Sequence, residues 1–150
     1  MNQQQEFFKL LKYSNELEKN EESLRKKDFD IFNLLLNFSV TIENNLHYSE
    51  KQQYIELAND YLTDQITADD FSYSFMAIYE GVTQKFGQMK RIESLELANF
   101  LKPSRPELGD LLARIYDSCD SFSPDPEIAM SDEKELEDCA QILLLKLQEE

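Results

Sequence analysis

The 150-residue sequence contains three glycines, four prolines, two cysteines, one histidine and no tryptophan. With so little glycine it has no glycine-rich phosphate-binding loop, which excludes the usual nucleotide sites. Cys119 and Cys139 are too few and too far apart for a zinc site. Free thiols are typical of a reducing cytosol, so we expect a cytoplasmic protein.

Other catalytic and metal-binding patterns are also absent. The only histidine, His47, stands beside Tyr48 at an expected helix junction, where a surface or capping role is the usual one. No serine lies in a nucleophile elbow, and without tryptophan an aromatic sugar cleft for glycoside chemistry is disfavoured. The acidic stretch 117–127 lacks the central glycine of a calcium loop. The sequence therefore predicts no enzyme, no cofactor and no metal site.

Long hydrophobic runs are missing as well. The longest apolar stretch, "IFNLLLNFSV", is interrupted by Asn33 and Asn37, whereas a transmembrane helix needs about 18 or more apolar residues. We therefore expect no membrane association. The first 80 residues contain neither glycine nor proline, which favours long helices, and no alternating pattern typical of a strand is sustained.

Apolar residues recur at spacings of three and four through most of the chain, which predicts an all-α fold. We expect an antiparallel helical bundle with a four-helix core in residues 48–150, preceded by an N-terminal helical hairpin extension in residues 1–47. Ser49 with Gln52, Thr67 with Asp70 and Asp132 with Glu135 resemble helix starts, and Pro106 suits a first turn. Gly87 suits a helix end. The expected helices are 3–24, 29–47, 49–64, 67–87, 94–101, 106–118 and one that follows Asp132.

What the sequence has in excess is negative charge. The formal net charge is −15, and 13 of the 30 acids but only 4 of the 15 bases lie after residue 102. A field of that sign repels nucleic acid and anionic membranes, and it attracts basic proteins and cations. The alternative is that the acidity serves solubility alone.

The stretch "DSCDSFSPDPE" (117–127) concentrates this charge. It places Asp117, Asp120, Asp125 and Glu127 around two prolines without any basic residue. Proline fixes backbone directions, so a stiff loop would present its carboxylates with little entropy left to lose on binding. Either the segment is a solvated surface turn, or it is a rigid anionic patch that docks lysines and arginines.

Three segments together carry a resemblance to a known family. They are "YIELANDYLTDQITADDFSYSFMAIYE" (54–80), "LGDLLARIYDSCDSFSPDPE" (108–127) and "LEDCAQILLLKL" (136–147). The chain resembles the colicin D immunity family over roughly residues 52–148. The resemblance rests on Ile66, Ala68 and Phe71 at a turn into an aromatic helix, on Glu80 at the end of that stretch, and on Asp120, Phe122, Pro124, Asp125 and Pro126 in the later turn.

The resemblance implies a small four-helix bundle without enzymatic activity that binds a tRNA-cleaving toxin and blocks its basic active site. It assigns partner binding to Asp117, Asp120, Asp125, Glu127 and Glu80. The first 50 residues have no counterpart in the smallest members of the family.

The alternative function is a non-enzymatic helical scaffold or adaptor that keeps the fold without a toxin partner. In that case the N-terminal helices would form a homodimer or a partner groove, through Phe7, Phe8, Leu11, Ile31, Leu35 and Phe38.

Overall fold

The computed structural model describes residues 2–149, and that part of the chain is all-α, as the apolar spacing predicts. Its elements, in chain order, are α1 (Gln3–Lys19), α2 (Leu24–Lys27), α3 (Phe29–Ser49), α4 (Lys51–Leu62), α5 (Ala68–Arg91), the 3-10 helix η1 (Leu95–Phe100), α6 (Pro106–Ser121) and α7 (Glu133–Gln148). None of these helices combines the length and the apolar character that a membrane crossing requires.

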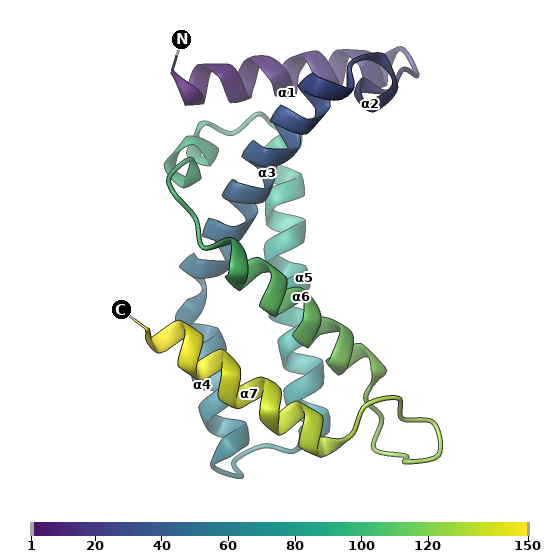
Figure 1. Cartoon of the computed structure of the whole chain (residues 1–150), viewed down its shortest axis with the longest axis vertical. Coiled ribbons are helices and arrows are strands. Elements are labelled where there is room, and N and C mark those ends of the chain that lie inside the picture. Colours follow the sequence, from purple (N-terminus) through teal and green to yellow (C-terminus); the bar gives the residue numbers. More distant parts are fainter. Residues whose placement is uncertain (1, 150) are drawn as a thin grey trace.

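The helices surround two groups of buried apolar side chains. Figure 1 shows α1 across one end of the molecule, α3 and α5 running along its length, and α4 and α7 at the other end. The first core lies among α4, α6, α7 and the first half of α5, and includes Tyr54, Phe71, Phe75, Leu112, Ile115, Leu136 and Leu143. The second core lies among α1, α2, α3, η1 and the last half of α5, and includes Phe7, Leu11, Ile42, Leu46, Val82, Phe86, Met89 and Leu97.

The second core combines residues from both sides of the expected boundary at residue 47. Val82, Phe86 and Leu97 bury their side chains against the N-terminal helices. Of the six side chains expected at a homodimer interface, Phe7, Leu11 and Leu35 are buried within the chain, and the other three are half-buried. These residues therefore form part of the protein's own interior. The N-terminal helices bury their apolar side chains against α5 and η1 rather than in a separate bundle.

Two residues after the end of α1, α4 and α5, the chain adopts a left-handed backbone conformation at a residue that is not glycine. Glu21, Asp64 and Glu93 have φ angles of 59°, 60° and 50°. Each is followed by a backbone N–H that donates to the carbonyl five residues earlier, for example from Ser94 to Met89 at 2.9 Å. This bond satisfies a carbonyl that the helix end leaves open. The expected helix 3–24 therefore breaks after Lys19.

Two predicted helix ends are wrong. Gly87 lies inside α5, which continues to Arg91 and turns at Glu93. Ser49 does not cap α4, because it is the last residue of α3 and its hydroxyl donates to the Leu46 carbonyl at 2.5 Å. The other start signals are confirmed: Thr67 and Asp70 form both bonds of a capping box, Asp132 accepts from the Glu135 N–H at 2.9 Å, and Pro106 opens α6.

Candidate functional site

Three of the predicted site residues gather where α6 packs against α5. The hydroxyl of Tyr116 in α6 donates a 2.5 Å hydrogen bond to Oε1 of Glu80 in α5. The ring of Tyr116 also packs on that of Tyr79, with centroids 4.9 Å apart. We call the surface formed by Glu80, Asp117 and Asp120 around these two tyrosines the acidic face. Its three carboxylate residues are all exposed.

Nearby carboxylates contribute to the raised pKa values of Tyr79 and Tyr116. The hydrogen bond to Glu80 is the main reason that the pKa of Tyr116 rises to about 12, and the charges of Glu80 and Asp120 add to it. Burial raises the pKa of Tyr79, with further contributions from Glu43 and Asp117. Both phenols are therefore neutral hydrogen-bond donors near pH 7, set among negative charges.

No base of the described chain neutralises the acidic face by an ion pair. In residues 2–149, the ion pairs that lysines form are with other carboxylates: Lys27 with Glu22, Lys134 with Asp138, and Lys146 with Glu149. Arg114, the one base within α6, lies four residues after Asp110 and three before Asp117, so its charge offsets part of theirs on the helix surface. With three exposed carboxylates against one neighbouring base, the acidic face therefore keeps a net negative charge.

Asp125 and Glu127 belong to a different part of the surface, the loop between α6 and α7 (Figure 1). Oδ1 of Asp125 accepts from the Glu127 N–H at 3.0 Å, and the Asp125 N–H donates to Oγ of Ser123 at 3.1 Å. The hydroxyl of Ser131 closes the loop by donating to the Ser118 carbonyl at 2.5 Å. Both carboxylates are exposed, and no described hydrogen bond or ion pair joins them to the acidic face.

A hollow of about 470 Å³ lies between this loop and the start of α7. Its walls are about half apolar and half polar, and the carboxylates of Asp132, Glu133 and Glu135 at the start of α7 are among the polar groups. The residues concerned include Phe122, Pro124, Pro126, Met130, Glu133 and Glu135. The loop therefore offers apolar contact area as well as charge.

A second, smaller pocket of about 230 Å³ lies where α3, α5 and α6 meet. It is lined by residues that include Glu43, Asn44 and His47 of α3, Tyr79 of α5, and Gly109 and Asp110 of α6. Gly109 allows the close approach of α3, because a Cβ at that position would lie 2.0 Å from Oδ1 of Asn44. Tyr79 lines this pocket and also packs on Tyr116 in the acidic face.

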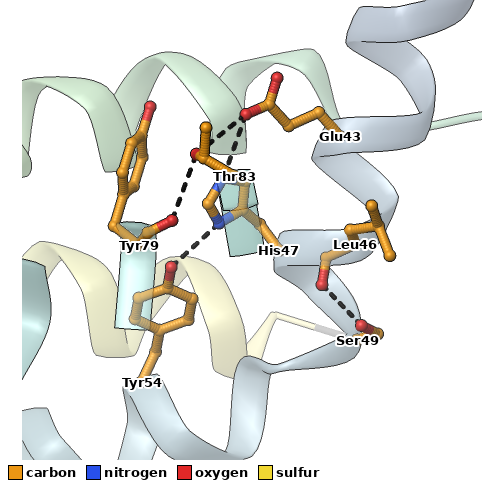
Figure 2. Close-up of polar contacts among 7 residues, drawn as sticks. All are labelled: Glu43, Leu46, His47, Ser49, Tyr54, Tyr79 and Thr83. Carbon is orange, nitrogen blue, oxygen red and sulfur yellow. Dashed lines mark hydrogen bonds and ion pairs between the residues drawn. The ribbon is translucent and has the colours of Figure 1, made fainter. Parts of the chain in front are cut away.

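His47 is buried beside this pocket, so the prediction of a surface or capping role is wrong. Its Nδ1 lies 3.0 Å from the hydroxyl oxygen of Tyr54, and its Nε2 lies 4.0 Å from Oε1 of Glu43 (Figure 2). Burial lowers the pKa of His47 to about 4, so the imidazole is neutral near pH 7. A neutral ring with its proton on Nε2, on the side of the Glu43 carboxylate, accepts at Nδ1 from the Tyr54 hydroxyl.

The sequence offers only a weak signal for this pocket. Asn44, Asn45, Leu46 and His47 are four consecutive buried residues, because α4, α5 and α6 surround this end of α3. A polar run of this kind has the composition of an exposed helix end. Within residues 2–149, no group of three or more His, Cys, Asp or Glu side chains is arranged to hold a metal ion.

Comparison with protein-family models, with curated proteins and with solved structures gives no match for this chain. The resemblance to the colicin D immunity family therefore stays a prediction from the residues that carry it.

Proposed function

We propose that the chain is an acidic, non-enzymatic inhibitor that binds and blocks the basic active site of a cognate tRNA-cleaving toxin. In this proposal α4 to α7 are the antiparallel four-helix core of a colicin D immunity-like protein, and the protein acts in the cytoplasm, where transfer RNA is cleaved. The observation that carries the proposal is the acidic face, on which Glu80, Asp117 and Asp120 surround two tyrosines without an ion-paired base.

The physical argument starts from what a ribonuclease must offer. A protein that grips the RNA backbone presents lysines and arginines, and carboxylates can occupy such a cleft in place of phosphates. Opposite charges on the two partners increase the association rate up to about 10⁸–10⁹ M⁻¹s⁻¹ at low salt. Tyrosines are enriched among the residues that contribute most to binding, so Tyr79 and Tyr116 suit the centre of such an interface.

The acids of α6 are poorly placed for the helix itself. Asp117 and Asp120 lie in its last turns, where the helix dipole favours positive charge. Lysines at these two positions would therefore suit the isolated helix better. A binding role accounts for carboxylates at this end of the helix. Because lysines there should not destabilise α6, a loss of binding on charge reversal can be attributed to the interface.

The test uses two double variants with equal changes in charge. Asp117→Lys with Asp120→Lys alters the acidic face, and Asp125→Lys with Glu127→Lys alters the loop. The parent chain, immobilised in lysate of its native cells, should capture a basic nuclease and inhibit its cleavage of tRNA. We expect the face variant to weaken this complex by about 3 kcal/mol or more, and the loop variant to act mainly on the association rate and salt dependence.

Two results would contradict the proposal. One is that the parent chain captures no basic nuclease. The other is that the face variant inhibits the captured nuclease as well as the parent does, while circular dichroism shows both proteins folded.

One observation favours the adaptor as a second candidate. Phe29, Leu36 and Val40 on α3 are 55%, 44% and 46% exposed. The last two line an apolar groove of about 450 Å³ between α3 and α5. If the chain dimerises there, Leu36→Gln with Val40→Thr should shift its sedimentation from dimer to monomer. A parent chain that is monomeric at the highest attainable concentration would contradict dimerisation.

A further inference from the structure

The pocket between α3, α5 and α6 is lined by a nearly buried polar side chain. Asn44 is 7% exposed, and no hydrogen bond of its side-chain amide is described. Because no fully buried side-chain nitrogen or oxygen of the described chain lacks a partner, the Asn44 amide must open to the space of the pocket that it lines. Its Oδ1 lies against the backbone of Gly109, on the wall of the pocket. An amide that belongs to a nearly buried residue and opens to a pocket marks a place where a ligand can supply its hydrogen-bond partners.

The charges around Asn44 define what kind of ligand fits. Glu43 on the α3 wall and Asp110 on the α6 wall line the pocket, and no lysine or arginine does. Oε1 of Glu43 accepts from the Thr83 hydroxyl at 3.2 Å and lies 4.0 Å from Nε2 of His47, so the carboxylate is held from one side (Figure 2). The second oxygen, Oε2, remains available to accept. His47 adds no positive charge, because it is neutral near pH 7.

The size of the pocket indicates where the ligand comes from. At about 230 Å³, it is smaller than the roughly 300–1,000 Å³ typical of sites for drug-sized molecules. Tyr79 lines it and packs on His47 on one side and on Tyr116 on the other, with ring centroids 4.7 and 4.9 Å apart. A protein that covers the acidic face would therefore reach the pocket with a side chain.

We propose that this pocket receives one lysine or arginine side chain of the basic partner, whose cationic head is bound by Glu43 and Asp110 with the amide of Asn44. The proposal rests on the proposed function, because it names a contact that the same partner makes. On α6, Asp110 lies two helical turns before Asp117 on the same side. The pocket thus extends the row of carboxylates on the acidic face inward, toward α3.

The experiment titrates the folded chain, labelled with ¹⁵N, with N-acetyl-arginine methylamide and with its neutral isostere N-acetyl-citrulline methylamide. We expect the arginine compound to shift the Asn44 side-chain amide and the Gly109 backbone amide, and the citrulline compound to leave both in place. Asp110→Asn should weaken arginine binding about tenfold or more, because it removes a charge-assisted hydrogen bond. Asp60→Asn, the same change at an exposed position of α4 outside the pocket and the acidic face, is the matched control.

Three results would overturn the inference. They are equal shifts with the two compounds, no shift at Asn44 and Gly109, or unchanged binding by Asp110→Asn. If Asp110→Asn lost its native spectrum, Glu43→Gln would take its place. Shifts confined to Tyr116 and Asp117 would contradict the pocket proposal and remain consistent with the inhibitor proposal. Conversely, a pocket that discriminates arginine from citrulline in a chain that captures no nuclease would retain the pocket and refute the inhibitor.

Discussion

Nδ1 of His47, at the end of α3, lies 3.0 Å from the hydroxyl oxygen of Tyr54 in α4, and both side chains are buried. The bond joins two helices that follow one another with a sharp change of direction (Figure 1). Tyr54 belongs to the first core, and Leu46, next to His47, belongs to the second. The contact therefore links the two cores, and protonation of His47 is expected to weaken the packing of both.

The first prediction concerns acid stability. Burial lowers the pKa of His47 from 6.5 to about 4 in the folded chain, so between these values the unfolded chain binds more protons. The free energy of unfolding should fall as the pH drops from 6.5 to 4, with a contribution of about 3 kcal/mol from this residue. Urea unfolding at several pH values measures it. His47→Asn keeps an acceptor for Tyr54 and cannot titrate, so its curve should be flatter by that amount; parallel curves would contradict the assignment.

The second prediction contrasts two glycines. At Gly109 an added Cβ would lie 2.0 Å from Oδ1 of the buried Asn44, whereas at Gly81 it would meet nothing within 4 Å. Gly109→Ala should destabilise the protein by about 1–3 kcal/mol through overpacking. Gly81→Ala should stabilise it by about 0.5–1 kcal/mol, because alanine is the better helix former. Thermal or denaturant unfolding checks both, and effects of equal sign would show that α3 does not approach α6 so closely.

A third prediction concerns the left-handed end of α5. Glu93 has a φ angle of 50°, a conformation that costs roughly 1–2 kcal/mol for residues with a Cβ and little for glycine. Glu93→Gly should therefore raise the free energy of unfolding by about 0.5–1 kcal/mol. Glu56→Gly, at an exposed site inside α4, should lower it by about 1 kcal/mol. A loss of stability in Glu93→Gly would mean that α5 ends differently.

The fourth prediction tests the contact that assembles the acidic face. The hydrogen bond to Glu80 is the main cause of the raised pKa of Tyr116, which is about 12. Glu80→Gln should lower this pKa toward the ordinary tyrosine value of about 10. NMR titration of the ring signals follows it, with Tyr116→Phe to assign the resonance. Glu96→Gln removes the same charge on η1 and should leave the pKa of Tyr116 unchanged. If both variants lower this pKa equally, the cause is the overall negative charge of the protein rather than the hydrogen bond to Glu80.

A fifth prediction concerns deletion of residues 1–47. The deletion removes most of the second core and uncovers Val82, Phe86, Met89 and Leu97. Each such side chain contributes about 1.5–3 kcal/mol when fully buried, and the total is comparable to the stability of a whole domain, about 5–15 kcal/mol. Hydrogen exchange should show that the last half of α5 loses protection. Full protection there would mean that residues 48–150 fold alone as a bundle.

Much of the local structure could be read from the residues. Apolar spacing identified the helices, and Thr67, Asp132 and Pro106 begin α5, α7 and α6 as predicted. These signals are local, since a cap bond or an apolar face depends on residues three or four apart. The helix ends near Glu21 and Glu93 escaped prediction because the left-handed turn uses no glycine, whereas the end of α4 near Asp64 was expected.

The candidate site depends on contacts between distant segments. Glu80 joins Asp117 and Asp120 only because Tyr116 crosses to α5, while Asp125 and Glu127, their sequence neighbours, lie on a loop that bonds to itself. Burial of His47 and Asn44 likewise follows from the meeting of α3 with α5 and α6. The sequence by itself determined the helices and the excess of negative charge, because both depend on nearby residues or on composition. Only the tertiary structure decided which carboxylates share a surface and which polar groups are buried, because helix packing brings together residues far apart in the chain.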